Sequence, residues 1–181
     1  MISLSNIGAM KKCNLWMNEY PNIECKCFEE LQKTIIKNNW AKWENVSCAI
    51  EVNLKQRHFS NYALLGMSYT HDNTDKLVIK VSAGEENGPI IENTLVSEVD
   101  EVHVGIPLEY AESVIKLAES YLNDVSCSSG TITFDIGGHG YIGSSSAIFR
   151  KVTEILLKIL CSDGNKEVKT IEKIVCDCLR Q

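Results

Sequence analysis

The chain has 181 residues, of which 44% are hydrophobic and 23% are charged, and this composition excludes an intrinsically disordered protein. A single hydrophobic core accommodates this length, so we expect one globular domain with an additional arm. The formal net charge of -6 argues against a protein that grips duplex DNA, because such proteins present a basic face to the phosphates.

The N-terminal segment, residues 1–46, is predicted to form a helical arm. The two lysines at 11 and 12 follow a weakly apolar stretch, the reverse of the order in a secretory signal, and no apolar run is long enough to span a membrane. We therefore expect a soluble, cytoplasmic protein that binds no membrane. Apolar side chains within residues 24–43 recur near the spacing of an amphipathic helix: Phe28, Leu31, Ile35, Ile36, Trp40 and Trp43.

Short runs rich in β-forming residues follow the arm. The runs at 47–54, 61–69 and 76–83 are apolar or alternate between apolar and polar residues, and polar clusters separate the later ones. This pattern predicts a meander of antiparallel strands, extended by a further strand within residues 90–104.

At Pro107 the period of the apolar residues changes from two to 3.6, and Pro107 and Glu109 both suit the first turn of a helix. The remaining pattern predicts an α+β fold, a mostly antiparallel sheet with helices on one face. The domain covers residues 47–161, and the C-terminal helix in 162–181 packs on it. The expected elements are a helix over 107–123, a strand over 131–136, a loop over 137–143, and helices over 145–160 and 166–179.

The eight cysteines are expected to be reduced thiols, because a chain of this length needs no disulfide staples. Neither of the two C-x-C pairs has the wider spacing usual for zinc ligands, so we expect no metal site and no cofactor. The cysteines are Cys13, Cys25, Cys27, Cys48, Cys127, Cys161, Cys176 and Cys178.

The segment DIGGHGYIGSSSAIF, residues 135–149, is the part of the sequence most indicative of function. Its glycines permit tight turns or close approach, and the hydroxyls of Ser144, Ser145 and Ser146 can cap the helix that follows. A helix start is also a site for anions, because its amides and its dipole point the same way. Two interpretations stay open here, a capped turn and a contact to the phosphate of a nucleotide or of RNA.

These motifs carry a resemblance to a known family. LVSEV at 95–99 followed by VGIPLEYAESV at 104–114 resembles the strand-to-helix passage of domain four of elongation factor G. The stretch 137–149 is similar to the later loop and helix of that domain, where a glycine, a histidine-containing tip, a serine pair and a phenylalanine recur. Residues 53–69 stand where that domain has its first long loop and second strand. The resemblance covers roughly residues 47–161.

The resemblance implies the ribosomal protein S5 domain 2-like fold, whose βαβ crossover is left-handed. It further implies a role in translation, because two loop tips of that domain reach the decoding region of the ribosome. The sequence contains no G-x-x-x-x-G-K-[ST] motif, so GTP hydrolysis is excluded. The residues that would contact RNA or the ribosome are, by position, Lys55, Arg57, His58, His139, Gly140 and Tyr141.

Two alternatives come from other classes of protein. YIGSSSA at 141–147 is similar to the phosphate-binding loop of the galactokinase, homoserine kinase and mevalonate kinase group, which would make the serines a nucleotide site with Asp135 or His139 as the base. That loop has glycine where this chain has Tyr141. Exposed tryptophans in the arm would instead make the protein an assembly subunit or homo-oligomer. Those tryptophans are Trp16, Trp40 and Trp43.

Overall fold

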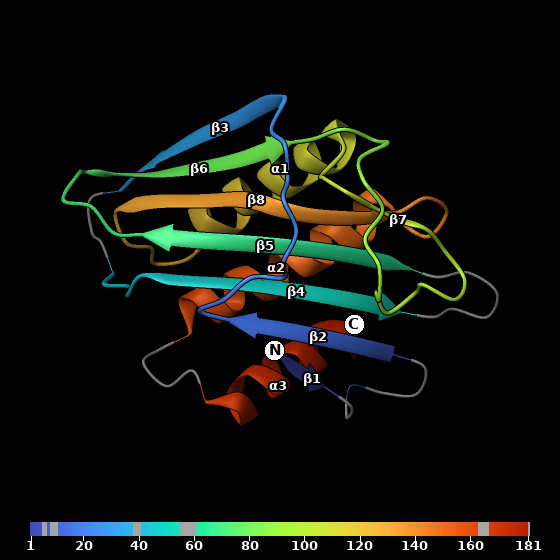
Figure 1. The fold of residues 1–181 in the computed structure, drawn as a ribbon. Coiled ribbons are helices and arrows are strands. Elements are labelled where there is room, and N and C mark those ends of the chain that lie inside the picture. Colours follow the sequence, from blue (N-terminus) through green and yellow to red (C-terminus); the bar gives the residue numbers. More distant parts are fainter. Residues whose placement is uncertain (5–6, 8–10, 38–40, 55–60, 163–166, 181) are drawn as a thin grey trace.

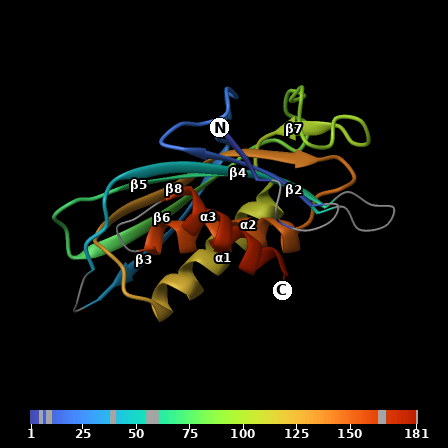
Figure 2. The ribbon, with the colours of Figure 1, turned by 90° about the horizontal axis from the view of Figure 1, so that it is seen from below.

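The computed structural model describes residues 1–4, 7, 11–37, 41–54, 61–162 and 167–180. Within these residues eight strands form one sheet, and three helices lie together on one of its faces (Figures 1 and 2). The predicted α+β class, a mostly antiparallel sheet with helices on one face, is confirmed.

The sheet has the strand order β1-β2-β4-β5-β8-β6-β3, and the short β7 pairs with one end of β8. All neighbouring strands are antiparallel except β6 and β8. The expected strands at 47–54, 61–69, 76–83 and 131–136 are present as β4, β5, β6 and the first half of β8. The predicted meander is wrong beyond β5, because β8 lies between β5 and β6. The strands are β1 Ile2–Leu4, β2 Lys11–Met17, β3 Glu29–Ile36, β4 Val46–Leu54, β5 Tyr62–Thr70, β6 Lys76–Ala83, β7 Val102–Val104 and β8 Gly130–Gly140.

The parallel strands β6 and β8 are joined by a crossover through α1, Leu108–Asp124. In Figure 1 both strands run to the right, β8 lies below β6, and α1 lies behind the sheet. This arrangement makes the crossover left-handed, against the usual preference for right-handed βαβ units.

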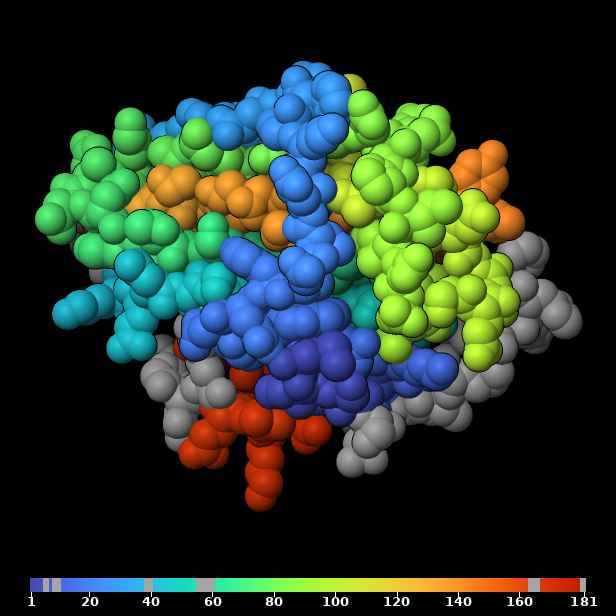
Figure 3. Space-filling view, in the orientation of Figure 1, coloured from blue at the N-terminus to red at the C-terminus, as the bar shows by residue number. Residues whose placement is uncertain are grey.

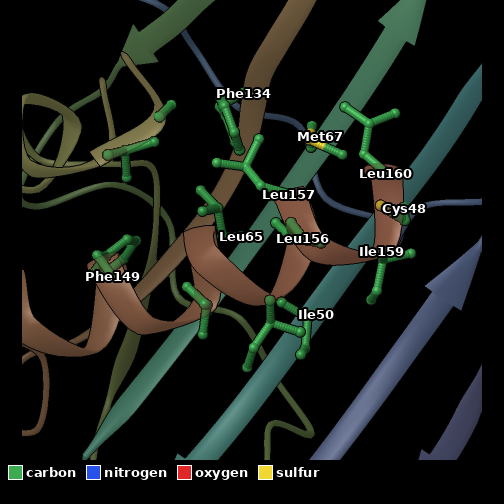
Figure 4. Packing of buried hydrophobic residues seen from close by; sticks show 14 of the residues in the cluster. Cys48, Ile50, Leu65, Met67, Phe134, Phe149, Leu156, Leu157, Ile159 and Leu160 are labelled. Carbon is green, nitrogen blue, oxygen red and sulfur yellow. The ribbon is translucent and has the colours of Figure 1, made fainter. Parts of the chain in front are cut away.

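The helices α1, α2 (Ser146–Cys161) and α3 (Val168–Arg180) agree with the predicted ones. Helix α1 packs over β3 and β6, α2 packs over β4 and β5, and α3 packs against α2. Alternation in the strands and the 3.6-residue period in the helices bring apolar side chains into one buried layer between them. Figure 4 shows part of this core, including Ile50, Leu65, Phe134, Phe149 and Leu156, all of them inaccessible to solvent.

The predicted helical arm at the N-terminus is wrong. Residues 29–36 form the edge strand β3, which pairs with β6, and β2 pairs with β4, so this part of the chain extends the same sheet. Leu31 and Ile35 are four residues apart. This spacing places two side chains on the same face of a helix, where it is about one turn, and also of a strand, where it is twice the two-residue period. Both lie on the face that α1 covers, which is the pattern of a strand.

The strand predicted within residues 90–104 is mostly irregular. Only Val102–Val104 pairs as β7, and Ile90 adds an isolated bridge to His103. The 84–101 segment lies instead across the sheet face that has no helices, where Leu95 and Val96 pack against Tyr62. Within this segment Asn93 has a φ of 58°, in the left-handed region.

Candidate functional site

Three segments meet at one end of the sheet, where β4 and β8 end and β5 begins. The amide of Tyr62, the first residue of β5, donates to the carbonyl of Gly143, and the amide of Tyr141 donates to the carbonyl of Glu101. The 141–143 turn therefore joins β5 to the 97–101 segment. Leu54 and Asn61, which flank the first predicted contact loop, are hydrogen-bonded to each other at the same end.

The sequence also predicts contact residues within that first loop. Lys55, Arg57 and His58 lie outside the residues that the structure describes.

The 141–143 turn is fixed by the carboxylate of Asp100. Its Oδ1 accepts from the amide of Ile142 at 3.1 Å, and its Oδ2 accepts from the amide of Gly143 at 2.8 Å. The Asp100 carboxylate can approach the turn this closely because residue 140 is glycine. A Cβ at that position would lie 2.3 Å from Asp100 Oδ2. One side chain thus locks the turn to the 97–101 segment.

The serines that follow the turn have different roles in the fold. The Ser144 hydroxyl donates to the carbonyl of Tyr62 at 2.6 Å and accepts from the amide of Gly140 at 2.8 Å. Ser145 is the N-cap of α2, and its hydroxyl accepts from the amide of Ile148 at 3.4 Å. Ser146 is the first residue of α2. The hydroxyls of Ser144 and Ser145 therefore hold the turn and the start of the helix.

The sequence predicts His139 at an exposed loop tip, whereas the structure places it inside strand β8 with only 6% of its surface exposed. The strand continues beyond its predicted end because β7 pairs with it as far as Gly140. Nδ1 of His139 lies 3.1 Å from the carbonyl oxygen of Gly105, and Nε2 lies 2.9 Å from that of Glu86. With both ring nitrogens facing backbone acceptors, His139 holds two segments together and is not placed to act as a base.

A cavity of about 250 Å³ opens beside His139 at the start of α1, and Glu86, Glu109 and Tyr110 are among the residues that line it. The Tyr110 ring lies edge-on to His139, with 6.2 Å between ring centroids. Burial raises the pKa of the Tyr110 phenol, and the negative charge of Glu109 raises it further. Among the described residues, no group of three or more His, Cys, Asp or Glu side chains is arranged to hold a metal ion.

The outermost part of the sheet end exposes apolar side chains. Tyr141 is 72% exposed, Ile142 71% and Val99 63%, and together with the exposed Glu98 and Glu101 they line a groove of about 330 Å³. We call these five residues the tip surface. The sequence indicates Tyr141 as a contact residue but does not single out Val99 and Ile142, whose signal is an apolar residue within an otherwise polar or glycine-rich stretch.

The other predicted residues that the structure describes do not line the groove of the tip surface. Asp135 is half-buried in β8, where its charge interacts with Tyr20 and Cys25 from the segment between β2 and β3. Ser146 begins α2, so Asp135 is not placed as a base for the serines. Trp16 and Trp43 are half-buried, and the Trp43 ring meets Tyr69 edge-on at 5.3 Å. Trp40 lies outside the described residues.

No family model matches the sequence, and neither a curated protein nor a solved structure matches the chain. None of the helices in the described part of the chain is long and apolar enough to cross a bilayer.

Proposed function

We propose that the protein is a non-catalytic interaction module that contacts the ribosome through the tip surface. The observation that carries the proposal is the exposure of Tyr141 and Ile142, each above 70%, on a turn held by side-chain and backbone hydrogen bonds. Apolar side chains gathered on a rigid, exposed turn are typical of a surface that another molecule covers.

Several hydrogen bonds make the turn rigid. Its amides are bound by Asp100 and the carbonyl of Glu101, and Ser144 ties its base to β5. A contact surface ordered in advance loses little conformational freedom on binding, so less of the free energy gained by burying Tyr141 and Ile142 is offset by the cost of ordering the turn.

The resemblance to domain four of elongation factor G supplies the ribosome as the partner. The left-handed crossover through α1 supports it, because a crossover of this hand is a feature that the resemblance implies. The predicted RNA contact through Lys55, Arg57 and His58 is a part of the same proposal.

A nucleotide site at the serines has less support. The hydroxyls of Ser144 and Ser145 are used by the backbone around them, and the exposed Tyr141 occupies the position of a glycine that the kinases need for close approach to phosphate. No second candidate function is therefore proposed.

Co-sedimentation of the purified protein with ribosomes tests the proposal. We expect salt-sensitive binding that falls about tenfold in the double variant Tyr141→Ser and Ile142→Ser. The matched control carries Ile36→Ser and Val168→Ser, which remove exposed apolar side chains from β3 and α3. Lys55→Ala with Arg57→Ala is expected to weaken binding and its salt dependence. The proposal is wrong if the native protein does not sediment with ribosomes, or if the tip variant and the control bind equally.

A further inference from the structure

We infer that the groove of the tip surface receives a cationic protein segment with an apolar anchor residue, and that nucleic-acid phosphate does not occupy it. This inference rests on the proposed function, because it concerns the same surface. It names the class of partner group that this surface contacts.

Two segments of the chain supply the apolar walls of the groove. Val99 comes from the 97–101 segment and Ile142 from the 141–143 turn, and both are exposed for most of their surface. A volume of about 330 Å³ accommodates one or two large apolar side chains, which would bury the exposed surface of these residues.

The rim of the groove is negative. Glu98 and Glu101 are exposed on either side of Val99, and no cation among the described residues lies within ion-pair distance of them. Rim charges of one sign favour a partner of the opposite sign mainly through the rate of encounter and through selectivity. The same charges repel phosphate, which is the group that dominates contacts to nucleic acids.

Hydrogen bonds fix the position of the 97–101 segment relative to the 141–143 turn. Asp100 accepts from the amides of the 141–143 turn, while the amides of Val99 and Asp100 both donate to the carbonyl of Val96, at 2.8 and 2.9 Å. The groove is therefore formed before any partner arrives, which favours a short segment that inserts one side chain.

A titration followed by amide chemical shifts tests the inference with defined probes. The cationic probe is the acetylated peptide KLKFKLK, and the comparison probes are ELEFELE, KSKSKSK and a uridine decamer. We expect the cationic probe to shift the amides of residues 97–101 and 141–143, with an affinity about tenfold higher than that of either comparison peptide.

Charge reversal provides the matched pair of variants. Glu98→Lys with Glu101→Lys is expected to lose about tenfold in affinity for KLKFKLK and to gain affinity for ELEFELE. Glu44→Lys with Asp75→Lys makes the same change of charge on exposed residues at the opposite end of the sheet and is expected to leave both affinities unchanged. Thermal unfolding of both variants checks that the fold is retained.

Several results would overturn the inference. They are equal binding of the acidic and cationic peptides, tighter binding of the uridine decamer at the tip residues, or no effect of reversing Glu98 and Glu101. A dimer in light scattering that the tip variant abolishes would make a second copy the occupant instead. If the charge-reversed variant still sediments with ribosomes while the Tyr141 and Ile142 variant does not, the proposed function stands and this inference alone fails.

Discussion

The two faces of the sheet are stabilised in different ways. On the face covered by helices, Ile50, Leu65 and Phe134 meet the side chains of α2 in a dry apolar layer. On the opposite face, the neighbouring Glu51 is a buried carboxylate, and irregular segments take the place of helices. Figure 3 shows the N-terminal segment and the 84–101 segment lying across this face. Apolar burial thus dominates on one face, while on the other face specific hydrogen bonds add to a smaller apolar cluster and fix the segment that forms half of the tip surface.

The largest effect should come from the apolar layer. Phe134→Ala removes a fully buried ring and leaves a cavity, so the free energy of unfolding should fall by about 3–5 kcal/mol. Urea unfolding measures the change. The control Thr133→Ala lies next to it in β8 and points to the opposite, half-exposed face, where we expect a change below about 0.5 kcal/mol. Equal losses at the two positions would contradict the distinction between the faces.

A smaller effect is expected from the buried carboxylate of the other face. Glu51 is 4% exposed and accepts from Asn14 Nδ2 at 2.8 Å, from the amide of Leu95 at 2.8 Å and from the Tyr62 hydroxyl at 3.0 Å. Glu51→Ala leaves these donors without an acceptor, and the free energy of unfolding should fall by about 2–3 kcal/mol.

Amide hydrogen exchange tests whether Glu51 stabilises the protein by holding the 84–101 segment on the sheet. Its substitution should speed exchange at Leu95 and its neighbours, because the segment opens locally, while exchange in α2 follows only the global change in stability. Tyr62→Phe removes one donor of the set and should cost about 1 kcal/mol or less. Uniform acceleration throughout the protein would contradict a local role.

The sequence predicts the helix-covered face better than the rest of the molecule, because burial on one side imposes a period of two on strands and 3.6 on helices. Those periods locate β4, β5, β6, α1 and α2. The edge strand β3 is missed because the spacing of Leu31 and Ile35 fits both periods. The end of β8 is missed because Gly137 and Gly138 indicate a loop in sequence, whereas in the fold they accommodate Ile106 and Ile91 from distant segments.

The candidate site is also predicted only in part, because some of its features are local and others depend on contacts between distant segments. Ser145 as a helix cap is a local feature, and local features can be read from the sequence. The burial of His139 depends on the carbonyls of Glu86 and Gly105, which lie 53 and 34 residues away in the chain. Val99 joins the tip surface because Asp100 and the carbonyl of Glu101 bind the 141–143 turn. Contacts of this range leave no periodic signal.

A third, smaller change in stability is expected from the serines between the 141–143 turn and α2. Ser144→Ala removes an acceptor from Gly140 and a donor from Tyr62, and Ser145→Ala removes the cap of α2, so each should lower the free energy of unfolding by about 1 kcal/mol. Ser146→Ala, the matched control in the first turn, should change it by less than about 0.5 kcal/mol. A cost at Ser146 as large as at Ser144 would show that the assigned hydrogen bonds do not distinguish them.

The smallest expected effect comes from Asp135 and depends on pH. Burial raises the pKa of this carboxyl above its value of 3.8 in the unfolded chain, and Oδ1 has no hydrogen-bond partner among the described residues. The native state therefore holds the proton more tightly than the unfolded state. It follows that Asp135 lowers stability once the pH exceeds the unfolded pKa, and that the penalty is complete above the folded pKa.

Asp135→Asn removes this penalty, so the variant should be more stable than the native protein at neutral pH. The gain should stay below about 1 kcal/mol, because the half-exposed carboxylate is screened by water. It should disappear well below pH 3.8, where the carboxyl is largely protonated in both states. Urea unfolding across the acidic range measures the difference, with the exposed Asp75→Asn as the control. A gain that persists in acid would mean that the amide stabilises the face through a new hydrogen bond, and that the charge of Asp135 is not what opposes folding there.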